Sequence, residues 1–138
     1  MRKTKVIGTV KPSQKKISDQ DNVIVVADDD PAILDAMKMI LESYNYKVET
    51  VSDGSVLPKL MTIKPKLLFL DIRMSGVNGK DVCRELKEID ETKDIPVVMI
   101  SASCDLIKIV KEAGADDFLE KPFEMNDLLS KVNKYLLN

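Results

Sequence analysis

The sequence predicts an α/β domain in which five parallel strands form one doubly wound sheet. From Asn22 onward, short apolar runs alternate strictly with segments of helical periodicity. The segments that connect them are short, and right-handed crossovers then place helices on both faces of the sheet. Four of the apolar runs are followed directly by acids, a hydroxyl or a lysine, and ligands of such sheets bind beyond the carboxyl ends of the strands. The pattern therefore predicts both the fold class and the edge of the sheet that carries the function.

The first two β–α units have clear boundary signals. A strand at 23–27 leads to a helix with Asp30 as N-cap and Pro31 at its first position, the places that these residue types prefer. A strand at 47–51 leads to a short helix at 56–63. Pro58 is tolerated there only in the first turn, so Ser55 is the expected N-cap.

The remaining three units follow the same alternation. The expected strands cover 66–71, 96–101 and 116–119, and the expected helices cover about 79–89, 105–113 and 125–137. Gly114 is expected to close the fourth helix. The fifth helix presents an apolar stripe that consists of Leu128, Leu129, Val132, Leu136 and Leu137. These lengths suit the flavodoxin-like strand order 2-1-3-4-5, whose switch point lies between strands one and three.

Charge divides the chain into two parts. Residues 1–22 carry six Lys or Arg against two Asp, which gives +4, whereas the other 15 Lys or Arg and 21 Asp or Glu give −6. We interpret residues 1–21 as a basic extension or linker, mostly disordered with a possible strand at 6–10, and residues 22–138 as one domain. An acidic body is a poor nucleic-acid binder. Because no stretch resembles a membrane span or signal peptide, the expected location is the cytoplasm.

Two residue counts exclude whole classes of site. The chain has no histidine, which excludes a His-based metal site, a Ser-His-Asp triad and a phosphohistidine within it. The two cysteines, Cys83 and Cys104, are too few for a disulfide framework and lack metal-ligand spacing, so free thiols are expected.

The residues that follow four strands combine acids, a hydroxyl and a cation. They are Asp28, Asp29 and Asp30 after the first strand, Asp71 after the third, Ser101 after the fourth and Lys121 after the fifth. Taken singly, each has an ordinary alternative as a helix cap, a solvated loop acid or a turn residue. Together they favour a phosphate-and-metal site. Crowded carboxylates repel one another, and an all-oxygen site of this kind suits Mg²⁺.

Such a site can support phosphoryl transfer to a carboxylate. A carboxylate beside a metal and a lysine can attack phosphorus and form an aspartyl-phosphate. The metal and Lys121 would neutralise the developing charge, and the Ser101 hydroxyl could bind one phosphoryl oxygen. The first β–α loop is rich in acid rather than in Gly, Ser or Thr, so FMN and NAD are unexpected ligands.

The motifs VIVVADDDP, LLFLDIRMSGVNG, VVMISAS and GADDFLEKPF, in this order, resemble the receiver domain of two-component response regulators. The resemblance implies that Asp71 is the phospho-acceptor and that Asp28, Asp29, Asp71 and the Arg73 backbone carbonyl bind Mg²⁺. It also implies that Lys121 and Ser101 contact the phosphoryl group and that Ser101 and Phe118 form the switch. The Lys121–Pro122 bond is expected to be cis.

The chain also departs from the family pattern. Ser75 replaces a usual proline, Phe118 replaces the common tyrosine, and the stretch from Ser101 to Lys121 is about two residues shorter than in chemotaxis-type receivers. The missing residues fall around the start of the fourth helix, next to the face that the fourth helix, fifth strand and fifth helix form.

The expected function is that of a receiver without an output domain in this chain, either stand-alone or part of a hybrid histidine kinase. It would catalyse only its own phosphorylation and dephosphorylation. The expected partners are a histidine kinase or histidine phosphotransfer protein and a downstream protein, with no nucleic acid and no membrane insertion. The domain would be a monomer or a phosphorylation-dependent dimer. One rival is a haloacid-dehalogenase-like phosphatase, which would need an Asp where Arg73 stands; another is a degenerate receiver that only docks partners.

Overall fold

The computed structural model describes residues 23–74, 76–102 and 105–137. The basic extension and the possible strand at 6–10, as well as Ser75 and Cys104, lie outside the described residues. Five parallel strands form the central sheet in the order β2-β1-β3-β6-β7. This confirms the predicted order 2-1-3-4-5, since two short extra strands shift the later labels. The strands are β1 (Val23–Ala27), β2 (Lys47–Val51), β3 (Leu67–Asp71), β6 (Val97–Ser101) and β7 (Asp117–Glu120).

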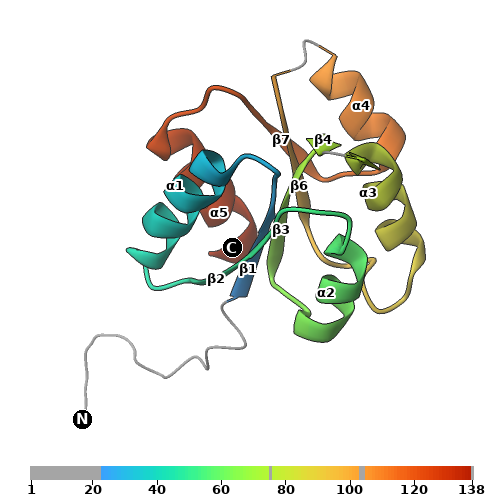
Figure 1. Ribbon diagram of the computed structural model, residues 1–138, viewed down its shortest axis with the longest axis horizontal. Helices are drawn as coiled ribbons and strands as arrows, with labels where there is room; N and C mark the ends of the chain where they lie inside the picture. Colours follow the sequence, from blue (N-terminus) through green and yellow to red (C-terminus); the bar gives the residue numbers. More distant parts are fainter. Residues whose placement is uncertain (1–22, 75, 103–104, 138) are drawn as a thin grey trace.

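Helices cover both faces of this sheet (Figure 1). One face carries α1 and α5, which pack on a core cluster that includes Ile24, Phe69 and Ile100. The opposite face carries α2, α3 and α4 over a cluster that includes Val25, Leu68 and Met99. The helices are α1 (Pro31–Glu42), α2 (Val56–Ile63), α3 (Gly79–Glu88), α4 (Leu106–Ala113) and α5 (Met125–Leu136).

The three inner strands are apolar because both of their faces are covered. Every residue of β1, β3 and β6 is buried, as expected for strands between two helical layers. Because side chains alternate between the faces, each strand supplies both clusters. Asp71 and Ser101 are the polar residues at the carboxyl ends of two of these strands. The sheet therefore holds the functional edge on a rigid support.

Most element boundaries agree with the sequence prediction to within one residue. Asp30 caps α1 by accepting a hydrogen bond from the Ala32 amide at 2.9 Å, with Pro31 next to it. The predicted place of Leu137 in the apolar stripe of α5 is wrong: the helix ends at Leu136, one residue earlier than expected, and Leu137 is 68% exposed. Among the described residues, none of the helices is both long enough and apolar enough to span a membrane.

Directly after β3 the chain forms a small hairpin that the sequence did not reveal. Its two-residue strands are β4 (Arg73–Met74) and β5 (Val77–Asn78), and they pair antiparallel. The hairpin leads to Gly79, whose amide donates to the Ile72 carbonyl at 2.7 Å. A Cβ at Gly79 would lie 2.3 Å from the Asp71 carbonyl oxygen and 2.8 Å from the Ile72 Cα. Only glycine permits this close return of the chain onto the residue that ends β3.

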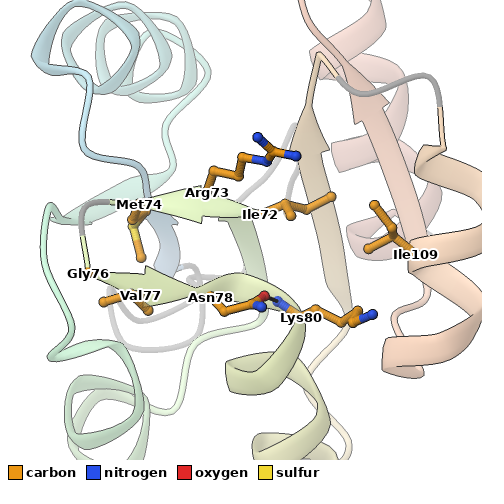
Figure 2. A pocket seen from close by; sticks show the side chains of 8 residues that line it. All are labelled: Ile72, Arg73, Met74, Gly76, Val77, Asn78, Lys80 and Ile109. Atoms are coloured by element: carbon orange, nitrogen blue, oxygen red, sulfur yellow. Dashed lines mark hydrogen bonds between the residues drawn. The ribbon is translucent and has the colours of Figure 1, made fainter.

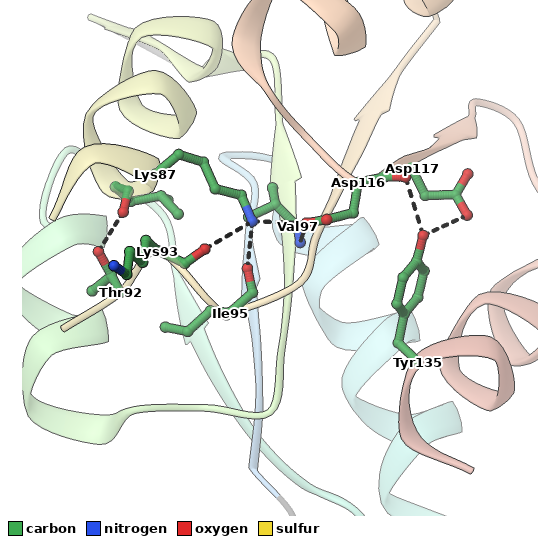
Figure 3. A network of polar contacts seen from close by, with 9 residues as sticks. Lys87, Thr92, Lys93, Ile95, Val97, Asp116, Asp117 and Tyr135 are labelled. Carbon is green, nitrogen blue, oxygen red and sulfur yellow. Dashed lines mark hydrogen bonds and ion pairs between the residues drawn. The ribbon is translucent and has the colours of Figure 1, made fainter. Parts of the chain in front are cut away.

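A polar network ties the elements together at the opposite end of the sheet (Figure 3). Lys87 in α3 donates to the Ile95 carbonyl at 2.9 Å and to the Asp116 carboxylate at 2.8 Å. The same Asp116 oxygen accepts from the Val97 amide at 2.8 Å. The Lys87 ammonium thus joins the end of α3 to the starts of β6 and β7.

Asp117, at the start of β7, is held by α5. Its carboxylate accepts from Lys131 at 2.9 Å, from Lys134 at 2.8 Å and from the Tyr135 hydroxyl at 3.1 Å. Burial raises its pKa, but these hydrogen bonds and one from the Phe118 amide outweigh burial and lower the pKa to about 2. The buried carboxylate is therefore ionised at neutral pH and fastens α5 to the edge of the sheet.

Candidate functional site

The strand register brings the predicted acids, hydroxyl and lysine together at one edge of the sheet. Ala27 pairs with Leu70, so Asp28 and Asp71 follow at neighbouring positions. Ser101 pairs with Glu120, and the Lys121 amide then donates to the Ser101 carbonyl at 2.9 Å. One carboxylate oxygen from each of Asp28, Asp29 and Asp71 lies within 4.8 Å of the other two. The convergence that the sequence predicted is confirmed.

Asp28 is fully buried, and its two oxygens have different surroundings. Oδ1 accepts from the Asp30 amide at 2.9 Å. Oδ2 lies 2.9 Å from the Lys121 ammonium but has no hydrogen bond of good geometry to any described residue. A buried carboxylate oxygen that is paired by charge alone retains capacity for a further cation.

Asp71 is 5% exposed, and its charge is unfavourable in this environment. Its Oδ1 accepts from the Arg73 amide at 3.2 Å, and its Oδ2 lies 3.7 Å from the Lys121 ammonium. Burial first, and then the neighbouring charge of Asp28, raise the pKa of Asp71 to about 6, although Lys121 and the Arg73 amide oppose the increase. A second cation at this edge would stabilise the ionised carboxylate, which is the nucleophilic form.

Lys121 connects the two buried acids. Burial alone would lower the pKa of its ammonium, but the close contact with Asp28 and the charges of Asp71 and Asp28 raise it. The closer of the two ion pairs is with Asp28, at 2.9 Å, rather than with Asp71. The Lys121–Pro122 peptide bond is cis, as predicted.

These residues line an open pocket of about 560 Å³. Ser101 is 6% exposed and lies at its wall beside the exposed Ala102. The full lining consists of Asp28, Asp29, Asp30, Asp71, Arg73, Ser101, Ala102 and Lys121. The ordinary alternative is correct for Asp30, which is a helix cap, but helix capping does not explain Asp28 and Asp71.

Phe118 lies outside this pocket. It is half-buried on β7, pairs with Met99 and packs against the core cluster beneath α4. The Lys131 ammonium lies 5.5 Å from the centre of its ring, and Asp117 holds the same ammonium. The ring is thus positioned between α4 and α5, two strand positions before the residue that pairs with Ser101.

The donor set fits a hard divalent cation. Three carboxylates offer oxygen ligands within 4.8 Å of one another, two of them buried, and no described His or Cys takes part. Mg²⁺ prefers oxygen ligands and keeps several waters, which an open pocket accommodates. The free capacity of Asp28 Oδ2 and the raised pKa of Asp71 are both consistent with a cation at this position.

Sequence reasoning missed two features that shape the site. One is the hairpin that carries Arg73, and the other is the packing of Gly79 against the Asp71 backbone. The two-residue strands are too short to produce a periodic pattern. The Asn78–Gly79 pair before an apolar helical stripe was the available signal, since Asn78 caps α3 by accepting from the Lys80 amide at 2.9 Å.

The fold and the site together define a class of protein. A family model of the response regulator receiver domain matches residues 24–133. The chain belongs to this family and is a receiver domain of the two-component type.

The chain is also similar to named response regulators. The chain is 34% identical over 116 residues to the DNA-binding response regulator MtrA of Mycolicibacterium smegmatis, which covers 82% of this chain and 50% of that protein. It is 38% identical over 125 residues to the response regulator protein TodT of Pseudomonas putida, and the match covers 88% of this chain and 54% of that protein. The chain thus spans about half the length of these curated relatives.

Solved structures agree with the fold. The receiver domain of NtrX from Brucella abortus has a TM-score of 0.75 and 31% identity, covering 83% of this chain and 98% of that one. A second structure is the receiver domain of a sensor histidine kinase from Pseudomonas aeruginosa, which has a magnesium ion coordinated in its active site cleft. It has a TM-score of 0.78 and 21% identity, and the match covers 86% of this chain and 99% of that one. At that identity the second likeness concerns the fold alone.

Proposed function

We propose that this chain accepts a phosphoryl group on Asp71 from a phosphohistidine of a partner protein and thereby switches the binding of a downstream protein. The observation that carries this proposal is the cluster of Asp28, Asp29 and Asp71 oxygens within 4.8 Å of one another, beside the shared ammonium of Lys121. Helix capping and solvated surface acids do not explain why two mutually repelling carboxylates are buried side by side. A site that binds a cation and a phosphoryl group explains it.

The proposed metal is Mg²⁺. Asp28, Asp29 and Asp71 would hold it with their carboxylates, and Arg73 would contribute its backbone carbonyl. When bound, the metal would neutralise part of the negative charge on the phosphoryl oxygens and on the nucleophile. Receiver domains bind Mg²⁺ at an acidic pocket of this type, which supports the assignment.

The transfer step forms one bond and breaks another. An Asp71 carboxylate oxygen attacks phosphorus, the P–N bond of the phosphohistidine breaks, and its electron pair leaves with the imidazole nitrogen, which takes up a proton. The Lys121 ammonium, which pairs with Asp28 in the free site, would also pair with the phosphoryl oxygens. The Ser101 hydroxyl would donate a hydrogen bond to one of these oxygens. The receiver would catalyse only this step and the later hydrolysis of its own phosphate.

A phosphohistidine donor has to lie outside this chain, because the chain contains no histidine. A groove of about 470 Å³ with a mainly apolar lining runs from Asp30 and Lys121 along α1, past Ile33, Ala36 and Phe123. It opens beside the acid pocket, since Asp30 and Lys121 line both. We infer that a helix of a histidine kinase or histidine phosphotransfer protein rests on this groove and presents its phosphohistidine to Asp71.

The switch and the setting of the domain are further parts of the proposal. Ser101 would bind the phosphoryl group, and the Phe118 ring would change position in response. The receiver would work in the cytoplasm as a monomer or a phosphorylation-dependent dimer. It would either act alone or belong to a longer protein such as a hybrid kinase, without touching nucleic acid itself.

Incubation with acetyl phosphate and Mg²⁺, followed by intact mass measurement, tests the proposal. The expected product carries one phosphoryl group, and EDTA prevents its formation. Lys121→Ala should slow phosphorylation while leaving Mg²⁺ affinity equal or higher, because a competing positive charge is lost. If the protein stays unmodified with Mg²⁺, it is a docking module. If it releases phosphate continuously from many substrates, it is a phosphatase.

A further inference from the structure

A second groove lies beside the acid pocket, between the hairpin and α4 (Figure 2). Its volume is about 580 Å³, and it opens to solvent next to the N-terminus of α3. Ile72, at the base, and Ile109, on α4, face this space from opposite sides in Figure 2. Val77 and the backbone of β4 and β5 continue the lining. The lining combines these apolar side chains with polar ones, and its apolar part can accept a side chain of a partner.

Two cations border this apolar surface. Arg73 extends from β4 on one side and Lys80 from α3 on the other (Figure 2). The Arg73 side chain is exposed and makes no ion pair with any residue that the structure describes. Lys80 is paired with Glu112 at 3.1 Å, and the positive charges of Lys108 and Arg84 also act on that same acid and help to lower its pKa. The groove lining itself therefore contains two cations and no acid, while the acids of the neighbouring pocket lie on the other side of Arg73.

This local excess contrasts with the rest of the domain. The chain beyond residue 22 carries 15 Lys or Arg and 21 Asp or Glu, so a basic border is not a general property of its surface. The segment of residues 1–22 carries six Lys or Arg against two Asp and has the wrong charge to fill the groove. Charge complementarity favours an acidic occupant from outside the chain.

We propose that the groove binds an acidic peptide segment of a partner protein. An apolar side chain of that segment would pack between Ile72 and Ile109. Carboxylates on either side of it would pair with the Arg73 guanidinium and the Lys80 ammonium. A planar guanidinium with a free fork is suited to bind a carboxylate through two parallel hydrogen bonds. This inference goes beyond phosphoryl transfer and does not depend on it, because the contacts involve the unphosphorylated protein.

The test is an NMR titration of the ¹⁵N-labelled chain with a blocked peptide that has two central leucines and three glutamates on each side. The expected result is saturable shift changes in the amides of Ile72, Val77, Lys80 and Ile109, weakened by added salt. A peptide with serines in place of the leucines and one with lysines in place of the glutamates should both bind at least about tenfold more weakly.

Two variants locate the binding. Lys80→Glu should weaken the binding of the acidic peptide about tenfold. Lys38→Glu is the matched control, because Lys38 is an exposed lysine of α1 paired with Glu42 at 3.6 Å and lies on the other face of the sheet. It should bind as the unchanged protein does. Ile109→Ala separates the apolar contact from the charge and should also weaken binding, with the amide spectrum showing that the fold is retained.

Three results would overturn the proposal. The first is an absence of shifts at millimolar peptide, and the second is shifts that map to α1 or that Lys80→Glu leaves unchanged. The third is shifts of the same amides with protein concentration alone, because they would assign the groove to a second copy of this chain.

Discussion

Replacing Asp71 with Asn should make the metal-free domain more stable at neutral pH, although it removes the proposed nucleophile. Asp71 is buried beside Asp28, and its ionised form is unfavourable there. Asn has nearly the same shape and carries no charge. The change breaks the longer ion pair of Lys121, at 3.7 Å, but leaves the pair with Asp28 at 2.9 Å. The repulsion between two buried carboxylates is thereby relieved at little cost.

The size of the effect follows from proton linkage. The pKa of Asp71 rises from 3.8 to about 6 on folding. An acid with a raised pKa binds its proton more tightly in the folded state, so it costs no stability below pH 4. The folded state loses stability as the pH rises from about 4 to about 6, and the loss is complete above that range. The difference corresponds to about 3 kcal/mol, which is the upper limit of the gain expected for Asn at pH 7.5.

Urea unfolding in EDTA measures this directly. At pH 7.5 the free energy of unfolding of Asp71→Asn should exceed that of the unchanged protein by about 2–3 kcal/mol, and at pH 4 the two should agree within about 0.5 kcal/mol. Asp35→Asn, at an exposed position of α1, removes the same charge and should change little. A variant that is equally or less stable at pH 7.5 would refute the argument that the acids are held in repulsion.

Three further predictions concern the support of the site. Asp117→Asn should lower the free energy of unfolding by roughly 1–2 kcal/mol at pH 7; the loss is small because solvent screens ion pairs with partly exposed lysines. The loss should shrink as the pH falls from 4 to 2, because the Asp117 carboxylate, with its pKa of about 2, is then protonated and no longer stabilises the fold. Gly79→Ala should cost about 1–3 kcal/mol in urea unfolding and weaken Mg²⁺ binding, because its methyl group would displace the Asp71 backbone. Cys83 should resist iodoacetamide in the folded protein, as burial raises its pKa to about 11, and peptide mass mapping should find it alkylated only in urea. These expectations would be contradicted by a pH-independent loss of stability in Asp117→Asn, by unchanged Mg²⁺ affinity in Gly79→Ala and by rapid alkylation of Cys83 in the folded protein.

Much of the fold was predictable because long-range order follows from strong local signals. The apolar runs of β1, β3 and β6 are buried on both faces and read as strands without ambiguity. Asp30 with Pro31 identified the start of α1 correctly. The lengths of the elements suited the strand order 2-1-3-4-5, and in that order the meeting of Asp28 with Asp71 is a geometric consequence.

The remainder depends on tertiary contacts that no short pattern encodes. The hairpin of β4 and β5 exists because Gly79 returns the chain onto the Asp71 backbone. Leu137 continued the apolar spacing of α5, yet the helix ends before it and leaves it exposed. That Lys121 pairs more closely with Asp28 than with Asp71 depends on differences of less than 1 Å in side-chain position.

Reductive trapping shows which aspartate receives the phosphoryl group, and we expect it to be Asp71. The protein is phosphorylated with acetyl phosphate and Mg²⁺ and treated with borohydride, which converts an aspartyl-phosphate to homoserine, and peptides are then sequenced by mass spectrometry. We expect homoserine at position 71 and at no other aspartate, and no homoserine in Asp71→Asn. Homoserine at position 28 or 29, or an unchanged yield in Asp71→Asn, would contradict this expectation.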